Sequence, residues 1–238
     1  MSSQLIKQPV MQSSDEIKHT LAEGVVAQLR EEIISGGLAG GMRIAEIPTA
    51  ERLGTSRVPV REAMLVLERE GLLVFEKRGR CSVRQLTPRD MDEIYEVRLL
   101  LEGESFRLAA RNHTLDDLEK LEDNIEQMAR ARTLARITLL DIEFHDLIVA
   151  ATRQSRLQHL WQVMRGQIQL FTAVLQREFE QRMQTVREVT VATHRKCVRV
   201  IRSRREEAAT EHGRKQFVKD LSGYERLSKE LKAESEKS

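Results

Sequence analysis

Apolar and polar positions separate most clearly in the segment 56–72. Its apolar side chains recur at helical spacing and would form one buried face: Val60, Ala63, Met64 and Leu67. Arg57 and Arg61 are four residues apart, so both guanidinium groups would project from the opposite face near the helix start. Ser56 is a good N-cap residue, and Gly71 would end the helix. Two cations in this arrangement suit the reading of bases in a DNA major groove.

The flanking segments complete a small domain around that helix. Apolar residues at helical spacing predict a helix over residues 22–35, and a shorter helix over 48–53 precedes a tight connection. Downstream, residues 72–75 and 81–83 have the composition of two short strands, joined by a basic loop with a central glycine. Three helices followed by a basic hairpin predict a winged helix-turn-helix over residues 15–86.

Beyond the hairpin the pattern is helical, without strand-like alternation. Thr87 can cap a new helix and Pro88 can occupy its first turn, which marks a domain boundary. Helices are expected over 88–111, 115–131 and 134–152, and from 155 to about 232 with weak interruptions at 165–166, 203–205 and 213. The fold class is therefore mainly α, with an all-α bundle of six or seven helices over residues 87–232. Residues 1–14 are expected to be disordered and the tail 233–238 to be frayed.

Charge and cysteine content narrow the classes of protein that fit this chain. The formal net charge is +2 over 238 residues, so binding to nucleic acid would depend on local basic clusters. Cys81 and Cys197 fall in different predicted domains, which is no disulfide framework. The sequence shows no signal peptide and no apolar run near the roughly 18 residues that a membrane span needs. We therefore expect a cytoplasmic protein without a membrane partner.

The helical half contains one group of residues with metal-ligand chemistry. Asp141 and His145 are four residues apart, so both side chains would reach one point from one helical face. His194 lies on an apolar helical face, which would direct its imidazole into the bundle core. A carboxylate and two imidazoles suit Zn²⁺, Ni²⁺ or Mn²⁺. A histidine hydrogen-bonded to an ordinary carboxylate is the structural alternative.

Arg98 is a second candidate, because it lies on the apolar side of its predicted helix and should face inward. A buried guanidinium is costly unless it is paired. Glu102, one turn on, is the structural partner, and an anionic effector is the functional one. The glutamate could satisfy Arg98 in the empty state while a carboxylate ligand competes for it in the bound state.

Four stretches of the N-terminal region fit a known pattern. They are G-G-M-R-I-A-E (40–46), L-G-T-S-R-V-P-V-R-E-A (53–63), L-E-R-E-G-L (67–72) and R-G-R-C-S-V (78–83). Residues 19–86 resemble the DNA-binding domain of the GntR family of bacterial transcription regulators. The resemblance implies that Arg57 and Arg61 contact bases or phosphates and that the wing glycine Gly79 enters the minor groove. The DNA-binding residues expected are Ser56, Arg57, Arg61, Lys77, Arg78, Gly79 and Arg80.

The C-terminal half carries a second resemblance, in R-L-L-L-E (98–102), D-I-E-F-H (141–145) and His194. These residues are similar to the helical ligand-sensing domain of the FCD subclass of GntR regulators, over roughly residues 90–220. In that subclass an aspartate and three histidines hold a divalent metal. Asp141, His145 and His194 carry over directly, whereas the last histidine would fall on Gln216. His212 lies one turn earlier on the same side of that helix.

The glutamine leaves several compositions of the site open. Water or effector could complete the shell around a metal, or His212 could supply a fourth ligand if its helix slides or rotates. The site could instead hold an organic ligand without metal, with Gln216 as hydrogen-bond donor, or be a purely structural polar cluster. The effector-binding residues expected are Arg98, Glu102 and Gln216.

Both resemblances imply a ligand-responsive DNA-binding regulator that is not an enzyme, with small organic acids as effectors and repression as the usual outcome. A homodimer would place two copies of the arginine-bearing helix on the half-sites of a pseudo-palindromic, double-stranded operator. A helical protein that binds DNA constitutively is an alternative. A metalloenzyme with an accessory DNA-binding domain is another, although no Glu/His pair stands out as a general base.

Overall fold

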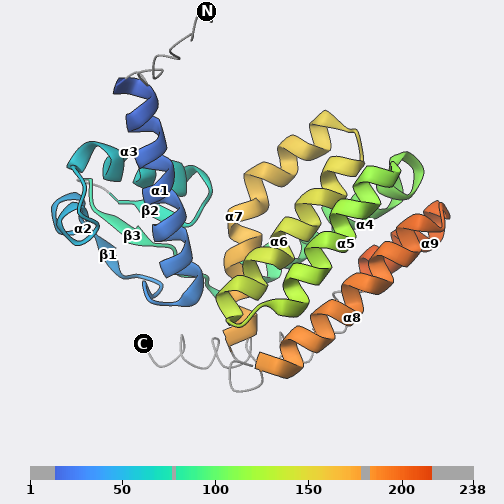
Figure 1. The fold of residues 1–238 in the computed structure, drawn as a ribbon. Coiled ribbons are helices and arrows are strands. Elements are labelled where there is room, and N and C mark those ends of the chain that lie inside the picture. Colours follow the sequence, from blue (N-terminus) through green and yellow to red (C-terminus); the bar gives the residue numbers. More distant parts are fainter. Residues whose placement is uncertain (1–13, 77–78, 178–182, 216–238) are drawn as a thin grey trace, which may run out of the picture.

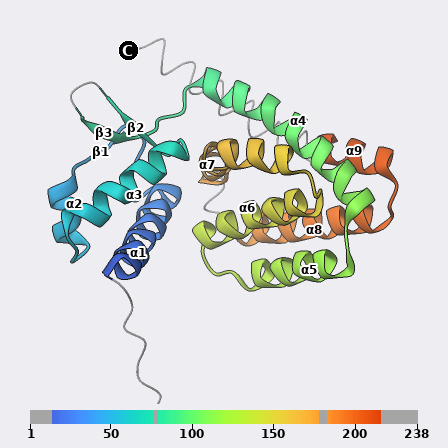
Figure 2. The same cartoon turned by 90° about the horizontal axis from the view of Figure 1, so that it is seen from above.

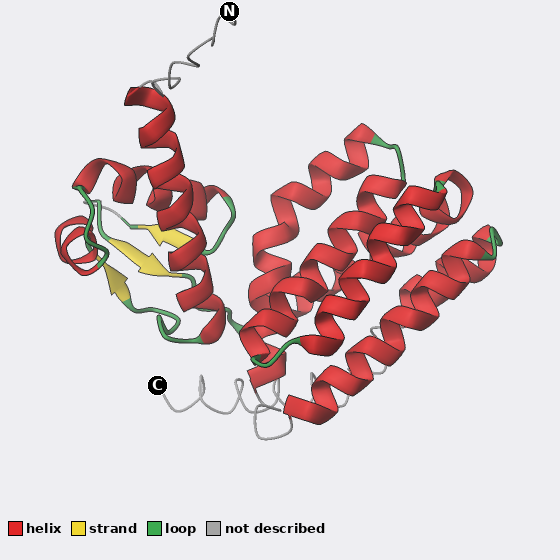
Figure 3. Cartoon of the chain, viewed as in Figure 1, coloured by secondary structure: helices red, strands yellow, loops and turns green. Residues whose placement is uncertain are grey.

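The computed structural model describes residues 14–76, 79–177 and 183–215, which form a small mixed domain and a larger helical one (Figures 1 and 3). The first contains α1 (Ser14–Ser35), β1 (Arg43–Ile44), α2 (Glu46–Arg52), α3 (Arg57–Arg69), β2 (Leu73–Phe75) and β3 (Cys81–Val83). The second contains α4 (Pro88–Asn112), α5 (Leu115–Arg130), α6 (Leu134–Ala151), α7 (Ser155–Arg177), α8 (Met183–Arg202) and α9 (Glu206–Lys215). The mainly α fold class is thereby confirmed, with six bundle helices among the described residues. Within those ranges no helix combines the length and apolar character that crossing a membrane requires.

Helix α3 forms as its pattern predicts. Its apolar face is buried, with Val60, Ala63 and Leu67 fully covered. The helix ends just before Gly71, whose φ of +74° is the left-handed conformation that favours glycine after a helix. Ser56 occupies the N-cap position, but its side chain makes no capping hydrogen bond. Ser56 therefore lies at the expected N-cap position, but its side chain does not cap the helix.

The hairpin carries a third strand that the sequence pattern does not reveal. β1 pairs antiparallel with β3, which also pairs antiparallel with β2, so the sheet order is β1-β3-β2. Because β1 has only two residues, it shows no alternation of apolar and polar positions, and periodicity does not predict it. The wing between β2 and β3 is closed by a hydrogen bond from Glu76 N to Arg80 O of 2.7 Å. Lys77 and Arg78 lie outside the described residues.

Two of the interruptions expected in the helical half are wrong. α7 continues through residues 165–166, and Gly213 lies inside α9. The break at 203–205 is confirmed, because Arg204 takes a φ of +55° between α8 and α9. The predicted helix start is confirmed, because Thr87 is the N-cap of α4 and forms a capping box in which Thr87 and Asp90 bond each other's backbone N–H. The predictions for residues 1–13 and beyond residue 215 fall outside the described residues.

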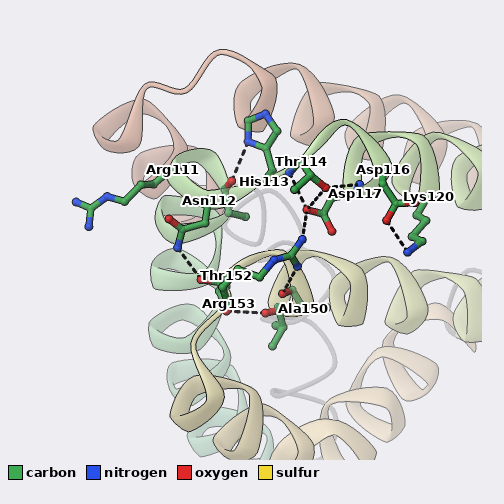
Figure 4. A network of polar contacts seen from close by, with 12 residues as sticks. Arg111, Asn112, His113, Thr114, Asp116, Asp117, Lys120, Ala150, Thr152 and Arg153 are labelled. Atoms are coloured by element: carbon green, nitrogen blue, oxygen red, sulfur yellow. Dashed lines mark hydrogen bonds and ion pairs between the residues drawn. The ribbon is translucent and has the colours of Figure 1, made fainter.

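A polar network fastens the corner where α4, α5 and α6 meet (Figure 4). Thr114 and Asp117 form a second capping box at the start of α5. Asp117 also accepts from Arg153 at 2.6 Å, and Asn112 donates to Thr152 O at 2.7 Å. His113 is buried and its Nδ1 lies 2.9 Å from Ala109 O. We call the residues labelled in Figure 4 the corner network.

The hydrophobic core is continuous across the domain boundary. One cluster joins side chains of α1 and α3 to Trp161, Ile168 and Phe171 of α7, and a second fills the space among α5, α6, α8 and α9. Figure 2 shows the ends of α6 and α7 facing the small domain, with α4 crossing at one edge. Helices α6 and α7 therefore both contact α1, and α7 also touches the end of α3.

Candidate functional site

The exposed face of α3 presents the two arginines expected there. The side chains of Arg57 and Arg61 are 65% and 71% exposed, and both lie near Glu46 of α2, at 3.2 and 3.9 Å. Ion pairs this exposed are worth about 0–1 kcal/mol, so phosphates or bases can displace Glu46 at little cost. Their common position at the helix start is the arrangement that the sequence predicts.

Only part of the expected wing contribution is described. Gly79 takes a φ of +73°, which favours glycine and turns the hairpin tip. Arg80 is half exposed and lies 3.1 Å from Glu76, whose negative charge offsets part of the positive charge of the wing. The described part of the tip is therefore less basic than the run from residue 77 to 80 suggests.

In the helical domain the structure brings together the three predicted metal ligands. Asp141 and His145 come from α6 and His194 comes from α8. Each offers a ligand atom within 4.8 Å of the others, and all three side chains are buried. Among the described residues this is the group of histidine, cysteine and acidic side chains whose atoms could surround one ion.

The contacts of His194 indicate what the group lacks. Its Nδ1 donates to Thr190 O at 2.8 Å, which in a neutral ring leaves Nε2 with a lone pair. Nε2 lies 3.2 Å from Asp141 Oδ1 and has no hydrogen-bond partner. A lone pair facing a carboxylate oxygen is repulsive unless a proton or a cation lies between them. This buried arrangement fits a divalent cation.

The carboxylates on either side of the histidines are held ionised. Burial alone would raise the pKa of Asp141, but His194, when a proton lies on its Nε2, and the charges of His145 and Arg98 hold that pKa well below its usual range. Burial acts on Glu102 in the same direction and is outweighed by Arg98 and His145, so its pKa is lowered too. Deprotonated carboxylates are the form that binds metal.

A chain of contacts fixes the orientation of His145. Glu102 Oε2 lies 2.8 Å from His145 Nδ1, so a cation would be held by the opposite ring nitrogen, Nε2. Glu102 Oε1 accepts from Arg98 Nε at 2.6 Å, and Arg98 donates to Thr172 Oγ1 of α7 at 3.0 Å. Arg98 therefore faces inward as predicted and is paired with Glu102. The sequence carries no signal for the part played by Thr172.

The structure does not bring His212 into the group. Its Nε2 lies 3.4 Å from Cys197 Sγ and its ring packs edge-on against Phe106, with centroids 5.9 Å apart. The substitution that the sequence suggested would need α9 to rotate, because a helical residue one turn away reaches a different level of the bundle. Gln216 lies outside the described residues.

The end of the arginine-bearing helix is packed directly on α7. A Cβ added at Gly166 would overlap the carbonyl oxygen of Glu70, the C-cap residue of α3. Glu70 is held by a bidentate ion pair with Arg30 of α1, with a closest distance of 2.7 Å. Gly166 is thus required for close approach of two backbones. Thr172, which binds Arg98, lies six residues along the same helix.

Two family descriptions match separate parts of the chain. Residues 21–83 match "Bacterial regulatory proteins, gntR family", and residues 93–216 match "FCD domain". The division agrees with the two domains of the structure.

Curated relatives share this organisation. An uncharacterised HTH-type transcriptional regulator, YdhC of Bacillus subtilis, is 31% identical over 189 residues, which cover 78% of this chain and 82% of YdhC. The gluconate operon transcriptional repressor of the same organism is 30% identical over 62% of this chain and 61% of its own length. These relatives are described as regulators of transcription rather than enzymes, which disfavours the metalloenzyme alternative.

Solved structures show the same fold at lower identity. The structure of E. coli McbR/YncC superposes with a TM-score of 0.73 at 21% identity, covering 87% of this chain and 98% of that one. A GntR-type transcriptional regulator from Rhodococcus sp. RHA1 has a TM-score of 0.64, also at 21% identity, over 90% and 98%.

Proposed function

The chain belongs to the GntR family of bacterial transcription regulators and carries an FCD ligand-binding domain, and we propose that its α3 reads an operator under control of the Asp141–His145–His194 group. GntR regulators bind operator DNA and typically act as dimers. The observation that carries the proposal is the combination, in one chain, of an exposed arginine pair with a buried polar group whose bonding is incomplete.

At the DNA, α3 enters the major groove of each half-site of a pseudo-palindrome. Arg57 and Arg61 contact bases or phosphates after leaving Glu46, and Ser56, whose hydroxyl is not used in capping, donates to a phosphate. The wing, including Lys77, Arg78, Gly79 and Arg80, lies along the adjacent minor groove. The expected outcome of binding is repression.

Arg57→Ala tests this interface, with binding sites selected from a random DNA library. The variant should lose about 1–3 kcal/mol of discrimination at one position of each half-site, because a bidentate base contact disappears. Arg69→Ala, an exposed arginine at the other end of α3, is the matched control and should leave base preference unchanged. Equal discrimination by Arg57→Ala and the parent protein between selected and scrambled DNA would remove Arg57 from base reading.

In the helical domain, Asp141, His145 and His194 hold Zn²⁺, Ni²⁺ or Mn²⁺, and water or effector completes the shell. A bound cation would supply positive charge that attracts a small carboxylate effector. Arg98 contributes a second positive group, and the effector competes with Glu102 for it. Gln216 remains a predicted hydrogen-bond donor to the effector.

Helix α7 transmits the signal, since it bonds Arg98 at Thr172 and touches the end of α3 at Gly166. An effector that changes the bonding of Arg98 would shift α7 and with it the placement of α3. A ligand alters DNA binding only by favouring one such placement.

A double variant, Asp141→Ala with His145→Ala, tests the sensing site. It should lose effector-induced release of DNA while its affinity for DNA without effector stays within about two-fold, because α3 is untouched. Metal analysis of protein purified without chelator is the second readout. A normal response by the double variant together with metal-free parent protein contradicts the sensing proposal.

Gly166→Ala tests transmission, with Gly24→Ala, where an added Cβ meets nothing within 4 Å, as control. The first variant should change operator affinity or effector response without altering metal content. If both variants behave as the parent protein, α7 does not carry the signal.

A further inference from the structure

A cavity of about 150 Å³ lies where the end of α1 meets the start of α6 and the end of α7, at the junction of the two domains (Figure 2). Its polar lining comes from all three helices. Ser35 ends α1, Thr133 caps the start of α6, and Arg177 lies at the end of α7. Ser35 and Thr133 are exposed, so small solutes can enter the cavity from solvent. Its volume is that of several water molecules, which is enough for a small polyatomic ion.

The charge of this lining favours an anion. Arg177 is its charged member, and no aspartate or glutamate occurs among the described residues that line the cavity. The Arg177 guanidinium donates to Ile33 O of α1 at 3.2 Å and packs on Gly36, where an added Cβ would lie 2.8 Å from Nη1. A guanidinium carries five N–H donors, so it can bond a carbonyl group and an oxyanion together.

Two hydroxyl groups add donors from other directions. Thr133 Oγ1 accepts from Arg136 N at 3.2 Å, so its hydroxyl proton is left to donate to another acceptor. Ser35 Oγ donates to Glu32 O at 3.2 Å in an exposed position, and a charged acceptor would outcompete that neutral carbonyl. The donors therefore approach from three helices instead of in one plane. A tetrahedral oxyanion offers oxygen atoms in all these directions, whereas a carboxylate offers two in one plane.

We propose that this cavity binds a phosphate group through Arg177, Thr133 and Ser35, and that the bound group holds the two domains in the placement described above. The ligand touches α1 of the DNA-binding domain and α6 and α7 of the helical domain at once. It therefore favours the placement in which these helix ends meet. Operator affinity then depends on phosphate as well as on the Asp141–His145–His194 group. The cavity shares no residue with that group, so the inference stands without the metal proposal.

Calorimetry on the full chain, in phosphate-free buffer at constant ionic strength, tests the site with inorganic phosphate, glycerol 3-phosphate and acetate. At least one of the two phosphates should bind about 10-fold or more tightly than acetate, because it accepts more charge-assisted hydrogen bonds. An ester that binds at least as tightly as inorganic phosphate identifies the ligand as a phosphorylated metabolite, and one that binds more weakly identifies free phosphate. Acetate binding as tight as that of both phosphates, or no binding of either phosphate, would overturn the proposal.

Arg177→Met should weaken phosphate binding by about 10- to 100-fold, because a charge-assisted hydrogen bond is lost. Arg136→Met is the matched control, since Arg136 is an exposed arginine of α6 that is bonded to Gln127 and does not line the cavity. It should change the Kd by about two-fold or less, because salt screens an exposed charge. Ala135→Leu fills the cavity and keeps its polar groups, so it should weaken binding even if Arg177→Met folds poorly. Undiminished binding by Ala135→Leu would contradict the site.

The arginines of α3 are the competing place for phosphate. Arg57→Ala should bind phosphate as the parent protein does, and if it loses the binding that Arg177→Met retains, the cavity is not the site. Asp141→Ala with His145→Ala should also retain phosphate binding, which separates this inference from sensing at the metal group. Saturating phosphate should change operator affinity by about five-fold or more in the parent protein, the low end of coupling between sites, and not in Arg177→Met. An unchanged operator affinity in the parent protein would overturn the effect on domain placement.

Discussion

The helical domain contains two polar groups that differ in burial and in how completely they are bonded: the partly exposed corner network and the buried Asp141–His145–His194 group. In the corner network, Asp117 accepts from both Thr114 and Arg153, and His113 is bonded to a backbone carbonyl (Figure 4). In the Asp141–His145–His194 group, His194 Nε2 faces a carboxylate without a hydrogen bond. The side chains of the first bond one another, whereas we propose that a cation completes the second.

The difference follows from where the partners lie along the chain. Most contacts of the corner network join residues three or four apart at helix ends, where unpaired backbone groups need caps. The second group joins two helices, α6 and α8, and is supported by Glu102 of α4, so its side chains meet only in the folded bundle. A buried histidine alone therefore does not identify a ligand site, and the proposal rests on the ring nitrogen that has no hydrogen-bond partner.

The largest expected effect concerns Glu102, which contacts His145 of the Asp141–His145–His194 group. Glu102→Gln should lower the free energy of unfolding by about 3–5 kcal/mol, because Arg98 would lose its anionic partner in the core. Glu104→Gln, two residues away and partly exposed in its pair with Arg107, should cost less than about 1 kcal/mol. Chemical denaturation measures both; similar costs would show that burial does not distinguish the two pairs.

Metal binding should stabilise the protein through the Asp141–His145–His194 group and not through the corner network. At free Ni²⁺ or Zn²⁺ of about 100 times the Kd, the free energy of unfolding should rise by about 2.7 kcal/mol. The rise should vanish in His194→Ala and persist in His113→Gln, a buried histidine of the corner network. Thermal melts with EDTA as reference measure it. A rise that survives His194→Ala would place the cation elsewhere.

Disrupting the corner network should lower the free energy of unfolding without altering the response to effector. Asp117→Ala removes one half of a capping box and the acceptor of Arg153, so we expect a loss of about 1–3 kcal/mol. The metal-induced stabilisation and the effector response, measured on the folded variant, should equal those of the parent protein. A changed response would mean that the two groups are coupled.

The smallest effect is the dependence of stability on acid. The pKa of Asp141 is lowered by folding, so its contribution is present above the unfolded value of 3.8 and is lost as pH falls through the folded pKa. With EDTA present, Asp141→Asn should reduce the slope of unfolding free energy with pH in this acid range, by at most about 1.4 kcal/mol per unit.

Asp117→Asn offers the comparison, since folding also lowers the pKa of Asp117. Its partner Arg153 is 48% exposed, so the effect of Asp117→Asn should shrink at high salt. The effect of Asp141→Asn should not, because Asp141 and His194 are buried. Equal salt sensitivity would contradict the contrast in burial.

Residues close in sequence were predictable, and those joined across helices were less so. Arg98 and Glu102 are one turn apart, and their pairing follows from helical periodicity alone. Asp141 and His194 are far apart in sequence; helical faces predicted only that both enter the bundle core, and the resemblance to FCD domains supported placing them in one site. The failure of His212 as a ligand depends on the rotation of α9 against α8, which no local pattern specifies.

By itself, the sequence determined the winged helix-turn-helix, the helical bundle, the helix start at Thr87 and the arginine face of α3, because caps and periodicity act over a few residues. The tertiary structure decided which buried polar atoms are bonded, since each bond depends on where another helix lies. It also decided that Gly166 serves close contact with α3 instead of interrupting α7. Among the described residues, the same long-range packing leaves Gln169 and His194 Nε2 without a hydrogen-bond partner.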